Sequence, residues 1–197
     1  MFWEDSAGPG LHETNVLCYK TGKEVEMNRL TALVTTTTAK AMLGMPASTL
    51  GWWINQRVIV PAMPARGTGT STILTAQQVW SIGIAKSLRT SGVGMDVCRR
   101  VASYLESLTA AQIEKAFAEG RTCLLIIRID DGADFLPRLM SPDAISDNPK
   151  MIEARKDAEA NGLTMTWVGI DVRPMLNQIL CRVAEDEVKR TAKKEPA

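Results

Sequence analysis

Residues 35–56, TTTTAKAMLGMPASTLGWWINQ, carry the pattern that decides the fold. The run of threonines can supply the N-cap of a first helix, because a hydroxyl accepts hydrogen bonds from the free amides of the first turn. Apolar residues then recur at helical spacing up to Gly44, a natural C-terminal stop. Pro46 opens a second helix, whose apolar face carries Leu50 and Trp53. The spacing predicts a helix, a short turn and a second helix, which is the arrangement of a helix-turn-helix.

Two short apolar segments follow the helix pair, with a loop of small residues between them. Residues 57–61, RVIVP, predict a strand that is closed by a proline, and residues 72–74, TIL, predict a second strand. The loop at 65–71 contains glycine and hydroxyl residues and no large apolar side chain. The sequence therefore predicts a β-hairpin, whose residues 62–74 form a wing beside the helix pair.

The remaining chain alternates between helical and extended patterns. Apolar residues at helical spacing predict helices, whereas continuous apolar runs bounded by turn signals predict strands. The expected helices span 75–91, 95–108, 109–120, 150–161 and 174–190, and the expected strands span 122–129 and 163–172. Residues 137–149 contain three prolines and are expected to form a loop.

These patterns divide the chain into four parts. Residues 1–28 lack a periodic pattern and contain a Ser-Ala-Gly-Pro-Gly segment, so we expect a flexible tail, and residues 191–197 are expected to form a second tail. Between the tails, residues 29–108 are expected to form a winged helix-turn-helix domain that binds DNA. Residues 109–190 are expected to form a small α+β region for dimerisation or for an effector. The expected fold class is α+β and mostly α.

An ordered set of residues within 35–105 resembles one known family. The set comprises Ala39, Leu43-Gly44-Met45, Ser48-Thr49-Leu50, Trp52-Trp53, Val58-Ile59, Pro61, Gly67, Gly69, Thr75, Val79, Leu88-Arg89 and Gly92-Val93. In this order and with these gaps, it is similar to the MerR-type winged helix-turn-helix family of bacterial transcription regulators. The resemblance covers about a third of the chain. It implies a MerR-like DNA-binding domain and dimers joined through helices after the wing.

Several positions depart from the family pattern. Gly51 stands where the family usually carries an arginine that reaches a phosphate, and Ile54 stands where an acid often follows the aromatic pair. In the wing, Thr68 and Thr70 accompany the single arginine Arg66, where the family favours arginines and a tyrosine. Hydroxyls bond phosphate oxygens without releasing counterions. We therefore expect weaker and less salt-sensitive DNA binding than is usual in the family, or a role away from promoters.

The charge of the chain is unevenly distributed. Residues 1–28 hold two Lys against five Asp or Glu, and residues 106–197 hold thirteen Lys or Arg against sixteen Asp or Glu. The middle segment, residues 29–105, holds eight Lys or Arg against one acid, Asp96. A basic middle between mildly acidic ends indicates that the middle meets a polyanion.

The predicted DNA contacts fall on the helix pair, on the wing and near helix ends. They are Lys40, Ser48, Thr49, Trp52, Asn55, Arg57, Arg66, Thr68, Thr70 and Arg89. Trp52 and Trp53 point about 100° apart on a helix, so we expect Trp53 to pack inside and Trp52 to lie on the sugar-phosphate backbone. Ser48 and Asn55 are expected to reach base edges. Arg66, at the wing tip, is expected to reach a phosphate or the minor groove.

No motif in the chain predicts catalysis. The only histidine, His12, lies in the expected tail, which excludes triads that need a histidine base. The chain contains no P-loop, no G-x-G-x-x-G and no H-E-x-x-H. Asp130, Asp131 and Asp171 end predicted strands and could gather around Mg²⁺ as in a nuclease, but no pattern fixes their geometry. We expect a protein that is not an enzyme and that has no cofactor and no metal site.

The cysteines and the hydropathy pattern indicate a compartment. Cys18, Cys98, Cys123 and Cys181 are far apart and form no C-x-x-C pair, so we expect reduced, buried thiols in the cytoplasm. The longest aliphatic run, residues 124–127, is far shorter than the ~20 residues that span a bilayer. No membrane partner is therefore expected.

These observations predict sequence-specific binding of double-stranded DNA by a dimeric transcription regulator, with RNA polymerase or another protein as a possible further partner. A single module of this size buries too little surface for tight specificity, so a homodimer on a palindromic site is expected. One alternative keeps DNA binding but assigns an architectural or phage-type role, excisionase-like or similar to a small terminase subunit. A second alternative is an antitoxin-like protein-interaction module, in which the α+β region does the main work.

Overall fold

The computed structural model describes residues 27–65, 67, 71–129, 137–142, 149–161 and 165–192. Over these residues the chain is a mostly helical α+β structure with two small antiparallel sheets. Its fold class therefore agrees with the expectation from sequence.

Short strands and a pair of short helices build the first half of the structure. The elements are the 3-10 helix η1 (Met27–Thr31), β1 (Leu33–Thr35), α2 (Thr36–Leu43), α3 (Ala47–Asn55) and β2 (Ile73–Thr75). The Thr35 hydroxyl accepts a hydrogen bond from the Thr38 amide at 3.2 Å and caps α2. Gly44 ends α2 in the left-handed conformation, with φ at 56°. The predicted pair of helices and the turn between them are confirmed.

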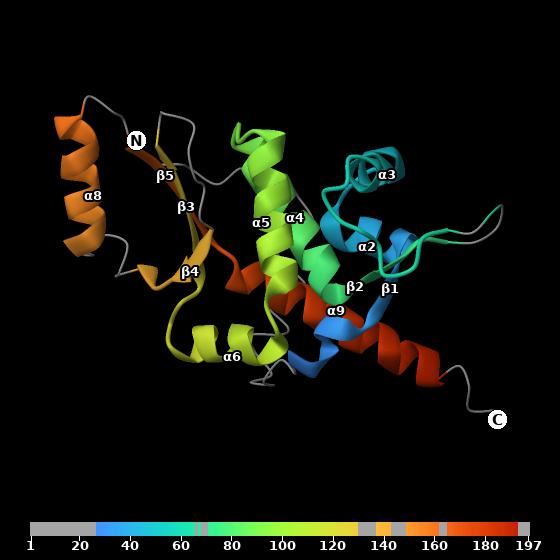
Figure 1. The fold of residues 1–197 in the computed structure, drawn as a ribbon. Helices are drawn as coiled ribbons and strands as arrows, with labels where there is room; N and C mark the ends of the chain where they lie inside the picture. Colours follow the sequence, from blue (N-terminus) through green and yellow to red (C-terminus); the bar gives the residue numbers. More distant parts are fainter. Residues whose placement is uncertain are drawn as a thin grey trace.

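Two longer helices form the centre of the molecule, α4 (Ala76–Thr90) and α5 (Met95–Ser107). Helix α4 is buried on several sides, because Trp80, Ile82 and Ile84 are all fully inaccessible to solvent. Helix α5 stands beside it and presents a buried apolar stripe to it (Figure 1). The helices predicted for these two segments are confirmed.

The second half of the chain builds a three-stranded sheet and its helices. The elements are α6 (Ala110–Ala118), β3 (Cys123–Ile129), β4 (Arg138–Met140), α8 (Pro149–Ala160), β5 (Met165–Asp171) and α9 (Arg173–Ala192). Strand β3 is central and antiparallel to both neighbours, with Cys123 opposite Met140 of β4 and opposite Asp171 of β5. Helix α8 lies at the outer end of this sheet, far from α3 (Figure 1).

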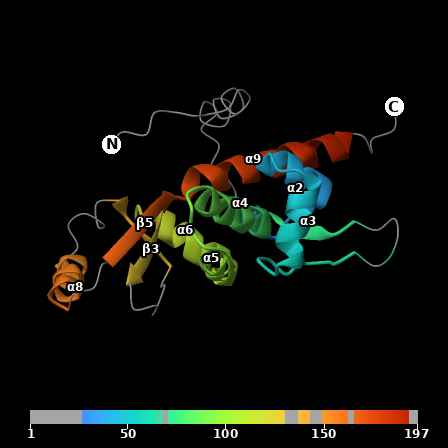
Figure 2. The same ribbon diagram turned by 90° about the horizontal axis from the view of Figure 1, so that it is seen from above.

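Helix α9 returns from the three-stranded sheet to the first half of the chain. It runs alongside α4 as far as α2 (Figure 2). Where α9 begins, the Trp80 indole donates a hydrogen bond to the Val172 carbonyl at 3.1 Å. Further along, Met175 lies directly against Gly83 of α4, where a Cβ would collide with the Met175 sulfur. One apolar core therefore includes both the first and the last described helices.

The strand predicted at 57–61 is wrong. Arg57 has a φ of 55°, which is left-handed backbone that no strand contains. Val58 and Ile59 turn into the core instead of pairing with another strand. The partner of β2 is β1, with Leu33 opposite Thr75, and among the described residues of the wing Met63 forms an isolated bridge with Ile73.

Smaller differences concern element boundaries. Helix η1 begins at Met27, inside the segment expected to be a tail, and α9 continues to Ala192. Strand β4 lies within the segment 137–149 that was expected to be a loop, where it pairs with β3. The expected N-terminal tail up to residue 26 lies outside the described residues. The division into domains at residue 108 stays a prediction.

The cysteines differ in part from the expectation. Cys98 and Cys123 are free thiols, whereas Cys181 on α9 is disulfide-bonded, which corrects the expectation that all thiols are reduced. Within the described residues, no helix is both long enough and apolar enough to cross a membrane.

Candidate nucleic-acid interface

One face of α3 is open to solvent and uncharged. Ser48, Trp52 and Asn55 are exposed and, at helical spacing, fall on one side, while Leu50 and Trp53 are buried on the other. The helix contains no acidic and no basic residue. The structure thus gathers three of the predicted DNA contacts on a single surface.

The two neighbouring tryptophans of α3 have different environments. Trp53 is 4% exposed and belongs to the core, whereas Trp52 is 48% exposed. Their rings meet edge to face, with centroids 6.3 Å apart and planes at 79°. The prediction that Trp53 packs inside and Trp52 points outward is confirmed. Trp53 therefore packs against the Trp52 ring on its protein side and leaves the solvent side of the Trp52 ring free to contact a ligand.

A hollow of about 290 Å³ lies between α2, α3 and β2. Its polar lining comprises Thr36, Thr37, Lys40, Asn55 and Thr72. These residues offer hydroxyls, an amide and an ammonium group, which are donors that suit phosphate oxygens.

The hollow joins two predicted contacts, Lys40 and Asn55, with Thr72, and it adds Thr36 and Thr37, which the sequence argument missed. Gly51 also borders it, and a Cβ at Gly51 would meet nothing within 4 Å. The missing side chain at this position therefore keeps the hollow open. A threonine run before a helix signals a cap, and it gave no separate indication of a binding surface.

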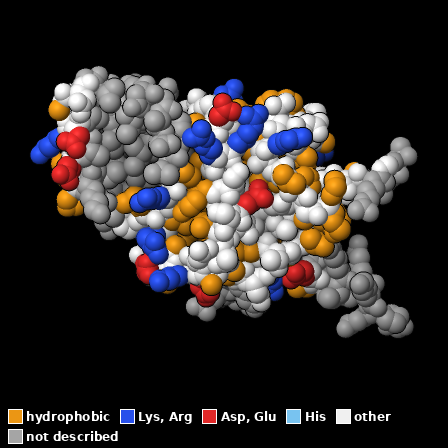
Figure 3. Space-filling view, viewed as in Figure 1, with side chains coloured by type: hydrophobic (Ala, Val, Ile, Leu, Met, Phe, Trp, Pro, Cys, Tyr) orange, Lys and Arg blue, Asp and Glu red, His pale blue; other side chains and the backbone are white. Residues whose placement is uncertain are grey.

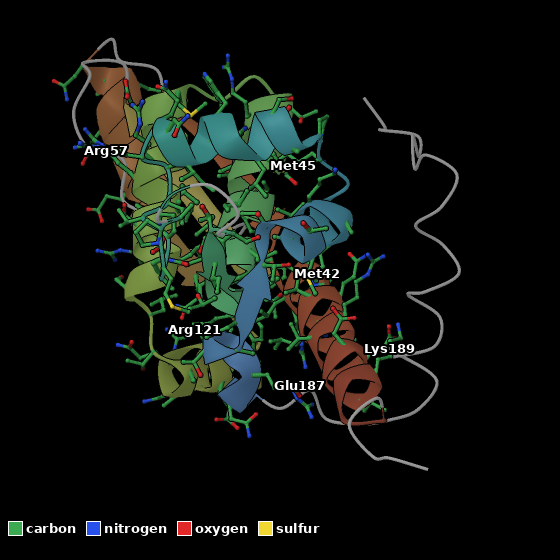
Figure 4. The ribbon with its side chains drawn as sticks, turned by 90° about the vertical axis from the view of Figure 1, so that its right-hand side faces the viewer. Met42, Met45, Arg57, Arg121, Glu187 and Lys189 are labelled. Carbon is green, nitrogen blue, oxygen red and sulfur yellow. The ribbon has the colours of Figure 1, made fainter. Side chains whose placement is uncertain are left out.

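Helix α3 ends in a Schellman motif whose left-handed residue is Arg57. The Arg57 amide donates to the Ile54 carbonyl at 2.9 Å, and the Val58 amide donates to the Trp53 carbonyl at 3.2 Å. Glycine is the usual residue at such a position, because its φ is positive. The Arg57 side chain is exposed, and it lies at the opposite end of α3 from Met45 (Figure 4).

Cations from the neighbouring helices bind the C-terminal carbonyls of α2 and α3. Lys86 Nζ of α4 donates to the Leu43 carbonyl at 2.8 Å, and Arg99 Nε of α5 donates to the Gln56 carbonyl at 2.9 Å. The negative end of each helix dipole favours this arrangement. Some of the basic charge that was expected to meet a polyanion therefore has a partner inside the protein.

Lys40 and Arg57 differ from those cations. Both side chains are exposed, and within the described residues neither side chain makes a hydrogen bond or an ion pair. The chain contains no acidic residue between Glu26 and Asp96, so no carboxylate of this segment competes for them.

Basic side chains also gather where α5 begins. Arg89 is exposed there, and Arg99 pairs with Asp96 at 2.5 Å. The blue surface over the N-terminal end of α5 extends toward α3 (Figure 3). Arg89, a predicted contact, donates to the Val93 carbonyl at 3.3 Å. Thr49, another predicted contact, lies on α3 and is half-buried.

The base of the wing is held by Gln78. Its amide oxygen accepts from the Ala62 amide at 3.2 Å, and its nitrogen donates to the Val60 carbonyl at 2.6 Å and to Glu106 at 3.3 Å. Burial raises the pKa of Glu106, and the bond from Gln78 lowers it by less. The predicted contacts Arg66, Thr68 and Thr70 lie outside the described residues.

The wing base is apolar where it meets solvent. Val60 is 72% exposed and Met63 is 43% exposed. Sequence reasoning treated the first of these residues as part of a strand and so missed this surface.

Within the described ranges, no cluster of three His, Cys, Asp or Glu side chains could hold a metal ion. Asp171 accepts a hydrogen bond from the Arg173 amide at 3.1 Å at the start of α9, while Asp130 and Asp131 lie outside these ranges. Burial raises the pKa of the Cys98 thiol, and burial together with Asp171 raises that of Cys123. Both thiols are therefore less prone to ionise than an exposed cysteine.

Comparison with known protein families found none that matches this chain, and a search of curated proteins found no relative.

Proposed function

We propose that this chain binds double-stranded DNA sequence-specifically, through a MerR-like winged helix-turn-helix in which α3 is the recognition helix. The observation that carries the proposal is the uncharged solvent-facing side of α3, bordered by Lys40 and Arg57, two exposed cations whose side chains have no partner among the described residues. The lack of acids between Glu26 and Asp96 supports it, because no carboxylate of this segment repels a polyanion.

In this proposal α3 lies in the major groove. Asn55 and Ser48 face base edges, where an asparagine amide can pair with adenine. The Trp52 indole donates to a backbone oxygen, and a phosphate occupies the hollow beside Lys40. The apolar wing base lies against the flanking backbone or minor groove.

We propose that the protein acts as a dimeric transcription regulator that has no catalytic activity and no cofactor. One α3 contacts too few base pairs for a high specificity ratio, so two copies on a palindromic site supply it. RNA polymerase or another protein is the proposed further partner.

The test is a salt series of binding to two fluorescent duplexes, one from the upstream region of the gene and one of random sequence. We expect preference for the upstream duplex in the wild-type protein and loss of that preference in Asn55→Ala. Lys40→Gln is expected to weaken binding to both duplexes and to lower the log–log salt slope by about 0.9 for one lost phosphate contact. Lys115→Gln on α6, remote from α3, is the matched control (Figure 1). Equal slopes for Lys40→Gln and the control would contradict the proposed phosphate site.

An architectural role is the second candidate, and the exposed apolar side chains Val60 and Met63 favour it. Apolar wedges that enter the minor groove unstack base steps and bend the duplex. Two results together would support this role: equal affinity for both duplexes, and a shorter end-to-end distance of the bound DNA than of the free DNA, measured by fluorescence energy transfer. Absence of binding at about 50 mM salt would overturn both DNA-binding proposals and direct the search to an antitoxin-like protein partner.

A further inference from the structure

Arg99 connects α5 to the end of the proposed recognition helix. Its Nε donates to the Gln56 carbonyl at 2.9 Å, and a terminal nitrogen donates to the Gln56 side-chain oxygen at 3.3 Å. The other terminal nitrogen donates to Asp96 at 2.5 Å, within the same helix. One guanidinium group thus joins the C-cap residue of α3 to the first turns of α5.

The location of this contact gives it influence over α3. Helix α3 begins at Ala47 after the N-cap residue Pro46, which gives no side-chain cap, and its buried residues are Leu50 and Trp53. Its C-terminal carbonyls carry partial negative charge, which a cation stabilises. The contact lies one residue after Asn55, so it fixes the end of the face that is proposed to read bases.

The geometry requires arginine rather than any cation. A guanidinium presents donors in a rigid fork and can reach a main-chain carbonyl, a side-chain amide oxygen and a carboxylate together. A lysine at this position has one ammonium group on a flexible stem and cannot reproduce this set.

We propose that Arg99 is a positioning residue that fastens the C-terminal turn of α3 to α5 and so sets the orientation of Asn55 and Trp52 toward DNA. This inference rests on the proposed DNA binding for its functional part, whereas its structural part is independent of DNA. Asp96 holds the guanidinium in place, and Gln56 accepts hydrogen bonds from it with both its main-chain carbonyl and its side-chain oxygen. Specificity depends on this contact more than non-specific affinity does, because base contacts need a defined helix orientation and phosphate contacts need charge.

The test compares Arg99→Lys, which keeps the charge, with the matched control Arg100→Lys on the next residue. For Arg99→Lys we expect affinity for the upstream duplex to fall about tenfold, because the last turn of α3 is no longer held in place and must be ordered when DNA binds. Affinity for the random duplex and its salt slope are expected to stay at the wild-type values. Arg100→Lys is expected to leave both affinities unchanged.

Amide hydrogen exchange supplies a readout that needs no DNA. The amides of Gln56, Arg57 and Val58 close the last turn of α3 and are expected to exchange faster in Arg99→Lys than in Arg100→Lys. Gln56→Ala, which removes one of the two acceptors, is expected to have a smaller effect in the same direction. In the double variant, Gln56→Ala with Arg99→Lys, the change in the free energy of opening of these amides is expected to be smaller than the sum of the two single changes.

The outcomes separate the two proposals. Unchanged exchange in Arg99→Lys overturns the positioning role, whether or not the protein binds DNA. The positioning role is also overturned if Arg99→Lys keeps the full affinity for the upstream duplex while Arg99→Gln lowers the log–log salt slope by about 0.9. That pair of results would make Arg99 a direct phosphate contact. If the wild-type protein does not bind DNA while exchange is faster, the DNA proposal fails and the fastening of α3 to α5 stands.

Discussion

Helices α4 and α3 are held in the molecule by different means. Helix α4 is enclosed by its neighbours, with Trp80 and Leu88 fully buried and a complete capping box at its start. Helix α3 buries Leu50 and Trp53 and leaves its opposite face to solvent. Its end is fixed from outside, by a side chain of α5. The comparison teaches that a helix can keep a whole face free for a ligand when one face is buried and its C-terminal end is held by a neighbouring helix.

The difference between the two helices can be tested by removing what holds each of them. Burial energies exceed capping energies several-fold, so the largest effects are expected in α4 and the smallest at polar contacts around the wing.

Trp80→Ala is expected to have the largest effect. It removes a fully buried indole and the hydrogen bond to Val172 that ties α4 to the start of α9. Truncation of a buried tryptophan costs about 3–5 kcal/mol of the free energy of unfolding. Chemical denaturation measures this loss, and Trp80→Phe is the milder control. A loss below about 1 kcal/mol would show that α4 is not enclosed in this way.

Trp53→Ala and Trp52→Ala are expected to separate folding from binding within α3. Trp53 is buried, so its truncation is expected to lower the free energy of unfolding by about 3 kcal/mol. Trp52 is half-exposed, so its truncation is expected to change stability by less than about 0.5 kcal/mol and to weaken DNA binding. Thermal unfolding and duplex titration on both variants check this. Equal destabilisation would mean that both rings support the core.

Gly44 and Arg57, two residues with left-handed backbone, are expected to respond in opposite directions to substitution. Gly44→Ala places a Cβ at a φ of 56° and is expected to cost about 1 kcal/mol of stability. Arg57→Gly relieves a non-glycine residue at a φ of 55° and is expected to add about 0.5–1 kcal/mol while it weakens DNA binding. Denaturant midpoints give the first quantity and a duplex titration gives the second. A stability loss in Arg57→Gly would contradict the strain assigned to Arg57.

Glu106→Gln is expected to have the smallest effect and to show it through pH. Burial raises the pKa of Glu106 in the folded protein above its value in the unfolded chain. The wild-type protein therefore loses stability as the pH rises through the folded-state pKa, and the glutamine variant does not. The free energy of unfolding, measured between about pH 4 and 8, should differ more between the two proteins as the pH rises. Glu106→Gln should be more stable than the wild-type protein at the higher pH. Parallel curves would show that Glu106 carries no burial penalty.

Local signals in the sequence predicted much of this architecture. Thr35, Thr75 and Thr109 cap α2, α4 and α6 as their hydroxyls suggest, and Gly44 ends α2. The 100° spacing of helical side chains correctly assigned Trp53 to the interior and Trp52 to the surface. Such features depend on neighbours a few residues away, so they can be read without knowledge of the fold.

Features that depend on distant partners were not predictable. Strand β1 has three residues and finds its partner about forty positions later, so no periodicity marks it. An arginine in left-handed backbone at residue 57 is rare, and the apolar residues after it resembled a strand. The roles of Lys86 and Arg99 as caps of other helices appear only when α2 and α3 are placed against α4 and α5.

The return of α9 also bears on the order in which the molecule is made. The buried side of α4 is covered by residues 172–183, which the ribosome adds roughly ninety positions after α4 itself. Until that segment emerges, the Trp80 indole lacks its hydrogen-bond partner Val172, and the side of α4 that α9 covers stays open. Folding of this core therefore waits until residues 172–183 have been made, and it needs contacts of high sequence separation, which slow it. A fragment that stops after α5 retains the surface residues proposed for DNA binding but lacks the helix that closes the core beneath them.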